Sequence, residues 1–391
     1  MERSILQSWG YDSYFSTAFS TALSALASPA SPASPARPDL APARVLSDLG
    51  VRVEIVEPSG QVRFAQLSGR LRHLLRPHER PTAGDWVVVA ADTGLGEPDL
   101  GAGAPSAAPG DIAIIHAVLP RRTQLVRRAA GRGDKHQLVA ANVDTFFVVT
   151  SANRDANVRR VERYLATVWD SGAAPVIVVN KVDLCAPGEL HAQLAELSAI
   201  APSVQIVSVS AHNGAGLGEI AAYLRPGRTV ALIGSSGVGK SSLVNRLLDD
   251  DRQAVLPIDA VDRGRHATTR RQLFALPSGG LVIDTPGMRE LGLAERGHGL
   301  DDAFADIAEL AGACRFRNCQ HRGEPGCAVD TAIASGGLDP DRLDSPHKLE
   351  RELEAIERRR DPALAREERT RMRAVNKAQR ARTKVDPKHH R

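Results

Sequence analysis

Residues 230–242 read Val230-Ala-Leu-Ile-Gly-Ser-Ser-Gly-Val-Gly-Lys-Ser-Ser242. The first four residues form an apolar run, which predicts a buried strand. Leu243, Val244, Leu247 and Leu248 follow at helical spacing. A strand, a glycine-rich loop and a helix in this order are the context in which a phosphate-binding loop is found.

The chemistry of such a loop explains its residue types. Glycines let successive backbone amides point at phosphate oxygens, and the following helix adds the positive end of its dipole. An ordinary glycine-rich turn would not need all four fixed positions of the motif. Lys240 is placed to reach the β- and γ-phosphates, and the Ser241 hydroxyl to ligate Mg²⁺. The residues expected to bind the triphosphate are Gly234, Ser235, Ser236, Gly237, Val238, Gly239, Lys240, Ser241 and Ser242.

A second motif, Asn180-Lys-Val-Asp183, directly follows an apolar run at 176–179. The Asp183 carboxylate can accept hydrogen bonds from both N1–H and the 2-amino group of guanine, a donor pair that adenine lacks. Asn180 and the stem of Lys181 would frame the ring, and a backbone amide after the next strand could meet the guanine carbonyl. The expected guanine contacts are Asn180, Lys181, Val182, Asp183, Ser210 and Ala211.

The motif Asp284-Thr-Pro-Gly287 follows another predicted strand at 281–283. It suits a carboxylate that holds Mg²⁺ through water and a glycine amide that senses the γ-phosphate. A polar segment, 264–270, precedes it, and there Thr268 or Thr269 could close on Mg²⁺. These residues are expected to form the hydrolytic part of the site.

The residue after Gly287 is Met288, which cannot hydrogen-bond a water strongly. Many GTPases place a glutamine there to orient the attacking water. His266 is the best internal candidate for that role, because an imidazole can accept from a water while donating elsewhere. The alternatives are that His266 packs or touches RNA and that a partner orients the water.

The order of these motifs is circularly permuted. Ordinary GTPases carry the phosphate loop first, whereas here the base-reading motifs at 180 and 210 precede the loop at 234. Alternating strand and helix patterns from 140 to 224 predict a parallel sheet covered by helices. A sheet cut and rejoined at exposed ends keeps its packing. The second switch, which is expected at Asp284-Thr-Pro-Gly287, therefore leads straight into the C-terminal region.

That region contains Cys314-x4-Cys319-x-His321-x5-Cys327. Three thiolates and one imidazole make a complete tetrahedral set for Zn²⁺, with no open position for catalysis. We therefore expect one structural zinc; the alternative is four unrelated buried residues. The fourth cysteine, Cys185, is interpreted as an ordinary core or loop residue.

The length of 391 residues predicts two or three domains, and a hydrophobic content of 42% is enough to pack their cores. The net charge is +4. Clustered cysteines favour a reducing compartment over a disulfide framework. No apolar run approaches 18 residues, and the N-terminus does not resemble a signal peptide. We therefore expect a cytoplasmic protein without membrane contact.

The chain before the GTPase region divides in two. Residues 1–42 are predicted to be an Ala/Ser/Pro-rich leader and linker with a small aromatic patch, a docking segment or a short helix packed on its own protein. Residues 43–125 contain short strand-like runs that predict an OB-type β-barrel, with a loop insertion at 94–110. This part carries basic residues that form either an RNA-binding footprint or a solvated surface. They are Arg70, Arg72, Arg76, Arg80, Arg121, Arg122, Arg127 and Arg128.

Three further segments complete the predicted multidomain architecture. Residues 126–292 form the central α/β P-loop GTPase domain, residues 293–350 a helical zinc-knuckle domain, and residues 351–391 a basic helical tail. Nine Lys and Arg residues and one acid occupy 369–391, a composition that often binds nucleic acid.

Taken together, the permuted order, the stretch Gly-Ser-Ser-Gly-Val-Gly-Lys-Ser-Ser-Leu, Asp-Thr-Pro-Gly and the cysteine–histidine knuckle resemble the RsgA (YjeQ) family of bacterial circularly permuted GTPases. The likeness covers roughly residues 43–350. It implies an OB domain, a GTPase and a zinc domain that act late in maturation of the small ribosomal subunit. Ala267 departs from the family pattern, since the first of three threonines usually stands there.

We therefore expect a GTP-hydrolysing assembly factor. It would be a monomer that binds GTP or GDP, the small ribosomal subunit and its rRNA, and the subunit would stimulate hydrolysis. Two alternatives stay open: a binding module in which the nucleotide is structural, and a GTPase that serves another RNA such as transfer RNA.

If His266 orients the attacking water, His266→Ala should leave GTP affinity near that of the wild type. Turnover stimulated by small subunits should fall by ~10²-fold, the scale for losing one positioning or proton-handling side chain. Equilibrium GTP binding and single-turnover hydrolysis measure the two effects separately. Unchanged turnover would assign the role to the ribosome.

Overall fold

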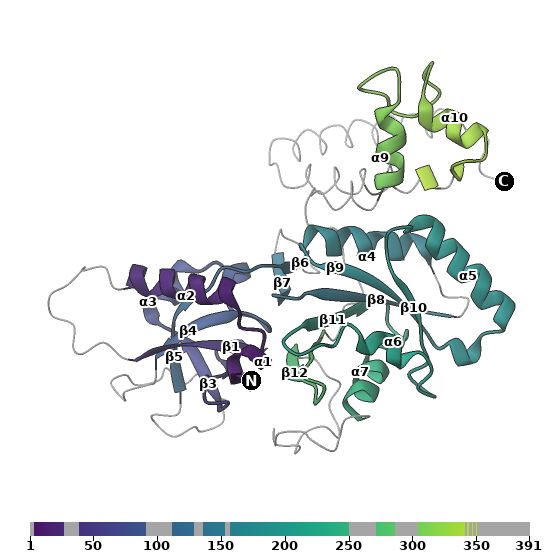
Figure 1. Cartoon of the computed structure of the whole chain (residues 1–391). Coiled ribbons are helices and arrows are strands. Elements are labelled where there is room, and N and C mark those ends of the chain that lie inside the picture. Colours follow the sequence, from purple (N-terminus) through teal and green to yellow (C-terminus); the bar gives the residue numbers. More distant parts are fainter. Residues whose placement is uncertain are drawn as a thin grey trace, which may run out of the picture. The chain divides into compact units, whose positions relative to one another are not determined.

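The computed structural model describes the larger part of the chain (Figure 1). The described residues are 4–26, 39–90, 112–128, 136–152, 157–249, 271–285, 304–340, 342, 343, 346 and 349. Predictions for His266, Thr268, Thr269, Gly287, Met288, the insertion at 94–110 and the tail at 351–391 lie outside them. Within the described part, no helix has both the length and the apolar character needed to cross a membrane.

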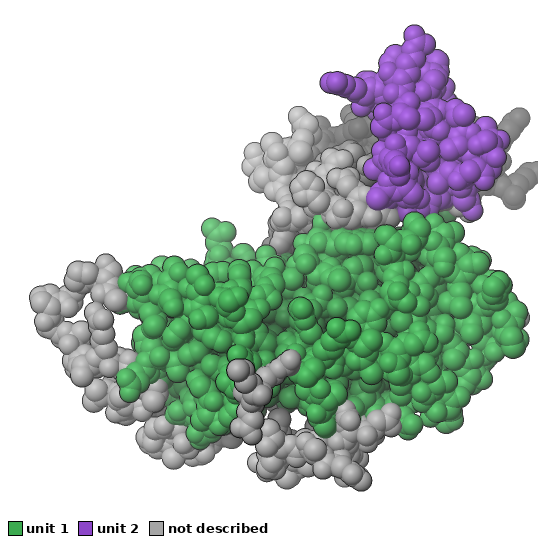
Figure 2. Space-filling view, in the orientation of Figure 1, with its two compact units in different colours: residues 1–129, 135–292, 298–303 green, residues 130–134, 293–297, 304–391 purple. Residues whose placement is uncertain are grey.

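The chain forms two compact units (Figure 2). The first comprises residues 1–129, 135–292 and 298–303. The second comprises residues 130–134, 293–297 and 304–391.

A parallel sheet forms the part of the first unit that was predicted to be a GTPase domain, called the GTPase part below. Its strand order is β10 (Ile206–Ser208), β9 (Ala174–Asn180), β8 (Thr145–Ser151), β11 (Thr229–Gly234) and β13 (Leu281–Asp284). The strand that leads into the phosphate loop is central, because Val230 pairs with Thr145 on one side and Val282 on the other. Ligands of such sheets bind beyond the carboxyl ends of the strands.

Helices cover both faces of this sheet (Figure 1). One face packs against α4 (Val158–Asp170) and α5 (Pro187–Ile200), and the other against α6 (Leu217–Ala221) and α7 (Lys240–Asp249). Side chains alternate along a strand. Phe146 of β8 accordingly belongs to the core under α4, and Phe147 to the core under α7.

The other part of the first unit is a closed barrel. Its strands are β1 (Leu40–Asp48), β2 (Val53–Val56), β3 (Val62–Leu67), β5 (Ile112–Val118) and β4 (Trp86–Ala90) in spatial order. The β1–β4 pairing closes the ring, and β3 runs parallel to β5. The barrel is of the predicted OB type. Helix α3 (Gly69–Leu74) and the 3₁₀ turn η1 (Pro77–Glu79) follow β3.

The predicted boundaries of the barrel differ from the structure. The first strand begins at Leu40, inside the predicted linker, because Ala41 to Arg44 pair with β4 despite a linker-like composition. The predicted boundary at 125 falls inside an antiparallel hairpin of β6 (Gln124–Arg128) and β7 (His136–Ala141), which the sequence pattern did not indicate.

The aromatic patch near the N-terminus packs on this barrel. Helices α1 (Ile5–Ser8) and α2 (Ser13–Leu26) flank Trp9, which is buried, as is Phe15. The Phe15 and Trp86 ring centroids are 5.7 Å apart. The described residues 4–26 are therefore part of the folded unit, not of a linker.

One strand joins the barrel to the parallel sheet. Strand β12 (Gln272–Ala275) runs antiparallel to β13 on one side and to β1 on the other. Gln272 pairs with Asp284 and also with Ser47. The described strands of the barrel and the GTPase part thus form one continuous sheet of eleven strands.

A buried arginine reinforces this joint. The guanidinium of Arg44, which is 1% exposed, donates to the carbonyl oxygens of Gly84 at 3.1 Å and Asn142 at 3.2 Å. It also donates to the Thr229 hydroxyl at 3.0 Å and to the Trp9 carbonyl. Burial lowers the pKa of Arg44 to about 10. The oxygens that accept hydrogen bonds from this buried charge thus come from four separate chain segments.

The second unit contains the helices α9 (Ala305–Gly312) and α10 (Ala328–Ala334). Arg342 forms an ion pair with Asp306 at 2.9 Å, and its guanidinium lies 4.5 Å from the centroid of the Phe304 ring. The cysteine–histidine segment connects the two helices.

Replacing Arg44 tests the joint. Arg44→Met should lower the free energy of unfolding by on the order of 3 kcal/mol, because several buried acceptors lose a charged donor. Urea denaturation followed by tryptophan fluorescence measures this, since Trp86 lies 5.3 Å from the guanidinium. The matched control is Arg70→Met on exposed α3, for which a change within about 0.5 kcal/mol is expected. Equal effects of the two changes would contradict the assigned role.

Candidate functional site

The phosphate loop connects β11 to α7 at the carboxyl edge of the sheet. Gly234 has a φ of +145°, and a Cβ there would lie 2.2 Å from the Val149 carbonyl oxygen, so only glycine fits. The ammonium of Lys240 donates to the carbonyl oxygens of Gly234 at 2.8 Å and Ser235 at 2.7 Å. These bonds hold the ammonium over the loop where a phosphate chain would run.

The base-reading motif is attached directly to this loop. The Asn180 side-chain amide donates to the Val238 carbonyl at 2.9 Å, and the Lys181 ammonium to the Gly237 carbonyl at 2.6 Å. Gly239 leaves room for Asn180, because a Cβ there would lie 2.3 Å from the amide nitrogen. The structure thus brings together two motifs that are far apart in the sequence.

The guanine-facing side is also ordered by side chains. Lys181 adopts a left-handed backbone with φ of 65°, and the 3₁₀ turn η2 (Val182–Leu184) starts there. One oxygen of the exposed Asp183 carboxylate accepts from the Ser210 hydroxyl at 2.5 Å, and the Ala211 amide donates to the Asn180 side chain at 3.1 Å. The second Asp183 oxygen can still accept from a base.

Asp284 ends β13, the strand beside β11. Burial raises the pKa of the Asp284 carboxyl, and the nearby charge of Lys240 opposes that rise. Burial likewise lowers the pKa of Lys240, while Asp284 opposes the fall. A partly buried carboxylate at this edge and the Ser241 hydroxyl at the start of α7 are oxygen ligands of the kind that Mg²⁺ prefers.

One contact to the loop was not predicted. Arg160, near the start of α4, donates to the Ser235 hydroxyl at 2.8 Å. Its position early in the helix after β8 was the only sequence signal, because that helix begins at the same edge of the sheet. Arg160 adds an exposed positive charge beside the phosphate loop.

Several arginines of the proposed RNA footprint have partners inside the protein. Arg121 pairs with the buried Asp85 at 2.8 Å, and Arg122 pairs with Asp12 at 2.6 Å. Arg127 donates to the Gln137 side chain at 2.9 Å. These three side chains each contact another part of the fold, and the choice between an RNA-binding footprint and a solvated surface stays a prediction. Arg70, Arg72, Arg76 and Arg80 are exposed.

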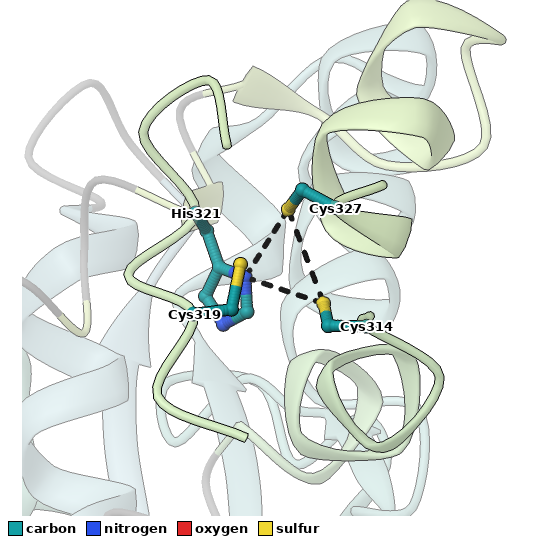
Figure 3. A group of neighbouring side chains, drawn as sticks. All are labelled: Cys314, Cys319, His321 and Cys327. Atoms are coloured by element: carbon teal, nitrogen blue, oxygen red, sulfur yellow. Dashed lines mark hydrogen bonds between the residues drawn. The ribbon is translucent and has the colours of Figure 1, made fainter. Parts of the chain in front are cut away.

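The second unit brings the four predicted metal ligands together (Figure 3). Their ligand atoms all lie within 4.8 Å of one another. The Cys314 and Cys327 sulfurs are 4.0 Å apart, and His321 Nδ1 lies 3.3 Å from the Cys327 sulfur. Tetrahedral zinc with Zn–S bonds of ~2.3 Å requires sulfurs ~3.8 Å apart. The donor set therefore fits a metal ion of that size.

Backbone amides prepare two of the sulfurs for this role. The Ala328 amide donates to the Cys314 sulfur and the Asp330 amide to the Cys327 sulfur, each at 3.3 Å. Such donors favour thiolates, which are the form that binds metal, whereas burial raises the pKa of the Cys327 thiol to about 12. Cys185 lies outside the cluster and contacts Glu189 instead.

Comparison with known proteins agrees with this geometry. The RsgA GTPase family model matches residues 118–294. The small ribosomal subunit biogenesis GTPase RsgA of Opitutus terrae is 44% identical over 388 residues, which cover 97% of this chain and 98% of the relative.

Two solved structures share the fold. YjeQ from Thermotoga maritima superposes with a TM-score of 0.58 at 26% identity, over 80% of this chain and 98% of its own. YloQ, described as a circularly permuted GTPase, gives 0.57 at 23% identity, over 84% and 99%. The permuted motif order, the barrel joined to the GTPase sheet and the near full-length relative lead to one assignment. The chain is a GTP-hydrolysing member of the RsgA family of circularly permuted GTPases.

Proposed function

We propose that this GTPase is an assembly factor that binds the small ribosomal subunit and its rRNA during late maturation, and that the subunit stimulates its GTP hydrolysis. The observation that carries the proposal is the likeness to the Opitutus terrae protein, a small ribosomal subunit biogenesis GTPase matched over 98% of its length. The OB-type barrel supports it, since such barrels often hold nucleic acid.

In the proposed site, the loop from Gly234 to Ser242 holds the phosphates, and Lys240 neutralises charge on them. Asp183 accepts hydrogen bonds from the edge of the guanine base. Asn180 and Lys181 hold the motif that contains Asp183 against the phosphate loop. Mg²⁺, when bound, neutralises charge on the β- and γ-phosphates, and Ser241 and Asp284 would hold it. Thr268, Thr269, Gly287 and His266 are proposed for the switch and water-positioning roles.

The metal of the second unit is proposed to be a single structural zinc. The cluster of three sulfurs and one imidazole nitrogen already supplies the four ligands of a structural zinc site. Its purpose would be to stabilise a unit whose described core is small. The basic tail is proposed to add phosphate contacts.

A GTPase assay with purified small subunits, large subunits or neither tests the function. We expect stimulation by small subunits alone. Stimulation by neither subunit would favour the structural-nucleotide alternative. Crosslinking that recovers transfer RNA in place of small-subunit rRNA would favour the second alternative.

Asp183→Asn tests base recognition. The amide presents a donor where guanine also donates, so GTP affinity should fall by about 10⁴-fold while xanthosine triphosphate binds better. Equilibrium titration with both nucleotides measures the switch. The control is Glu196→Gln, at an exposed residue of α5, which removes the same charge away from the site. Undiminished GTP affinity of Asp183→Asn would remove Asp183 from this role.

Cys319→Ser tests the metal site. Removing a residue that hydrogen-bonds a metal ligand weakens metal binding by about 10–100-fold. Removing a ligand itself should therefore weaken zinc binding by at least ~10²-fold. Metal analysis of the purified protein should give one zinc per chain in the wild type and in Cys185→Ser, and far less in Cys319→Ser. Guanine-nucleotide affinity should stay near that of the wild type. Full zinc content in Cys319→Ser would exclude the proposed ligand set.

A further inference from the structure

A second polar cavity lies within the first unit, away from the phosphate loop. Its volume is about 580 Å³. The barrel, the β6–β7 hairpin and the start of β12 all contribute to its walls. The lining residues used here are Asp48, Gln66, Arg72, Arg80, Gln137 and Arg271.

The lining of this cavity carries a net positive charge. Three arginines and a single carboxylate, Asp48, line it. Arg72 and Arg80 are exposed, and no described residue pairs with either guanidinium. The guanidinium of Arg271 is half-buried and donates to the Leu138 carbonyl at 2.8 Å. A cavity lined by three guanidinium groups and one carboxylate suits a phosphate, which guanidinium groups bind in bidentate fashion.

The burial and surroundings of Arg271 agree with this. Burial and the nearby charge of Arg127 lower the pKa of Arg271, and Asp48 only partly opposes them. Arg127 donates to the side-chain oxygen of Gln137, which lines the cavity. A fourth cation therefore contacts the lining. The local repulsion among these groups would be relieved by an anion.

The remaining walls indicate more than a bare anion. Gln66 and Gln137 bring amides, and Leu67 and Ile115 bring apolar surface. The hydroxyl oxygen of buried Thr82, another lining residue, has no hydrogen-bond partner among the described residues. Guanidinium groups can bind the phosphate of a nucleotide unit, and amides and a hydroxyl can hydrogen-bond the edges of its base.

We propose that this cavity binds a phosphate-bearing nucleotide unit of single-stranded RNA, and that Arg271 transmits its occupancy to the GTP site. The proposal rests on the proposed function for the source of the RNA. A free polyphosphate nucleotide shares the same chemistry.

The route from the cavity to the GTP site is short. Arg271 directly precedes β12, and Gln272 pairs with Asp284, the proposed Mg²⁺ carboxylate. The proposed switch threonines, Thr268 and Thr269, stand just before Arg271 in the sequence. A phosphate that binds Arg271 therefore acts on the strand beside Asp284 and on the chain that leads to the switch.

Paired double variants test the cavity. Arg72→Ala with Arg80→Ala removes two lining cations, and Arg70→Ala with Arg76→Ala removes two exposed cations that do not line it. Both pairs change net charge equally. Affinity for a short fluorescent single-stranded RNA is measured by anisotropy between 50 and 200 mM salt. The slope of log affinity against log salt should flatten by about 1.4 in the lining pair, because each lost phosphate contact contributes about 0.7. The control pair should change it much less, and equal changes would overturn the proposal.

Two further arms identify the ligand and the coupling. Inorganic pyrophosphate is titrated into the wild type and into the lining double variant. If it binds only the wild type and does not displace RNA, the cavity is assigned to a free polyphosphate. Arg271→Gln should reduce the ratio of RNA-stimulated to basal turnover more than it reduces RNA affinity, and parallel losses would overturn the coupling. If small subunits fail to stimulate the wild type, the proposed function fails, whereas the RNA and pyrophosphate comparisons still decide the cavity.

Discussion

The buried guanidinium of Arg44 sets the architecture of the first unit. A charge taken out of water costs several kcal/mol unless its donors are all satisfied. Here the acceptors come from the N-terminal segment at Trp9, the barrel at Gly84, and the GTPase part at Asn142 and Thr229. None of these segments can leave without exposing an unpaired donor. The barrel and the GTPase sheet are therefore held together by a polar joint as well as by apolar packing.

The nucleotide site shows how far the sequence alone could predict the structure. The loop at 234–242 and the motif at 180–183 were predicted because fixed chemistry demands particular residues at fixed spacing. Their mutual bonds, such as Asn180 to Val238, were not, since a tertiary contact leaves no local pattern. Arg160 was missed for the same reason.

Errors near the N-terminus have a different physical cause. β1 contains Ala41, Pro42 and Ala43, so its composition resembles the preceding linker, and only pairing with β2 and β4 makes it a strand. Arg121 and Arg122 look like surface cations in the sequence. Their partners, Asp85 and Asp12, are distant along the chain, and the fold alone brings them together. The fold class was predictable because it depends on motif order and periodicity.

The continuous sheet is a route by which binding of RNA and binding of GTP, the two proposed ligands, could affect each other. Gln272 pairs with Asp284 on one side and with Ser47 of the barrel on the other, so one strand carries contacts to both parts. If RNA at Arg271 changes the affinity for GTP by some factor, GTP must change the affinity for RNA by the same factor. On the proposed coupling, loss of the γ-phosphate would therefore change the affinity of the barrel for RNA. Because β12 lies between β13 and strand β1 of the barrel, the proposed coupling would need only one strand to shift.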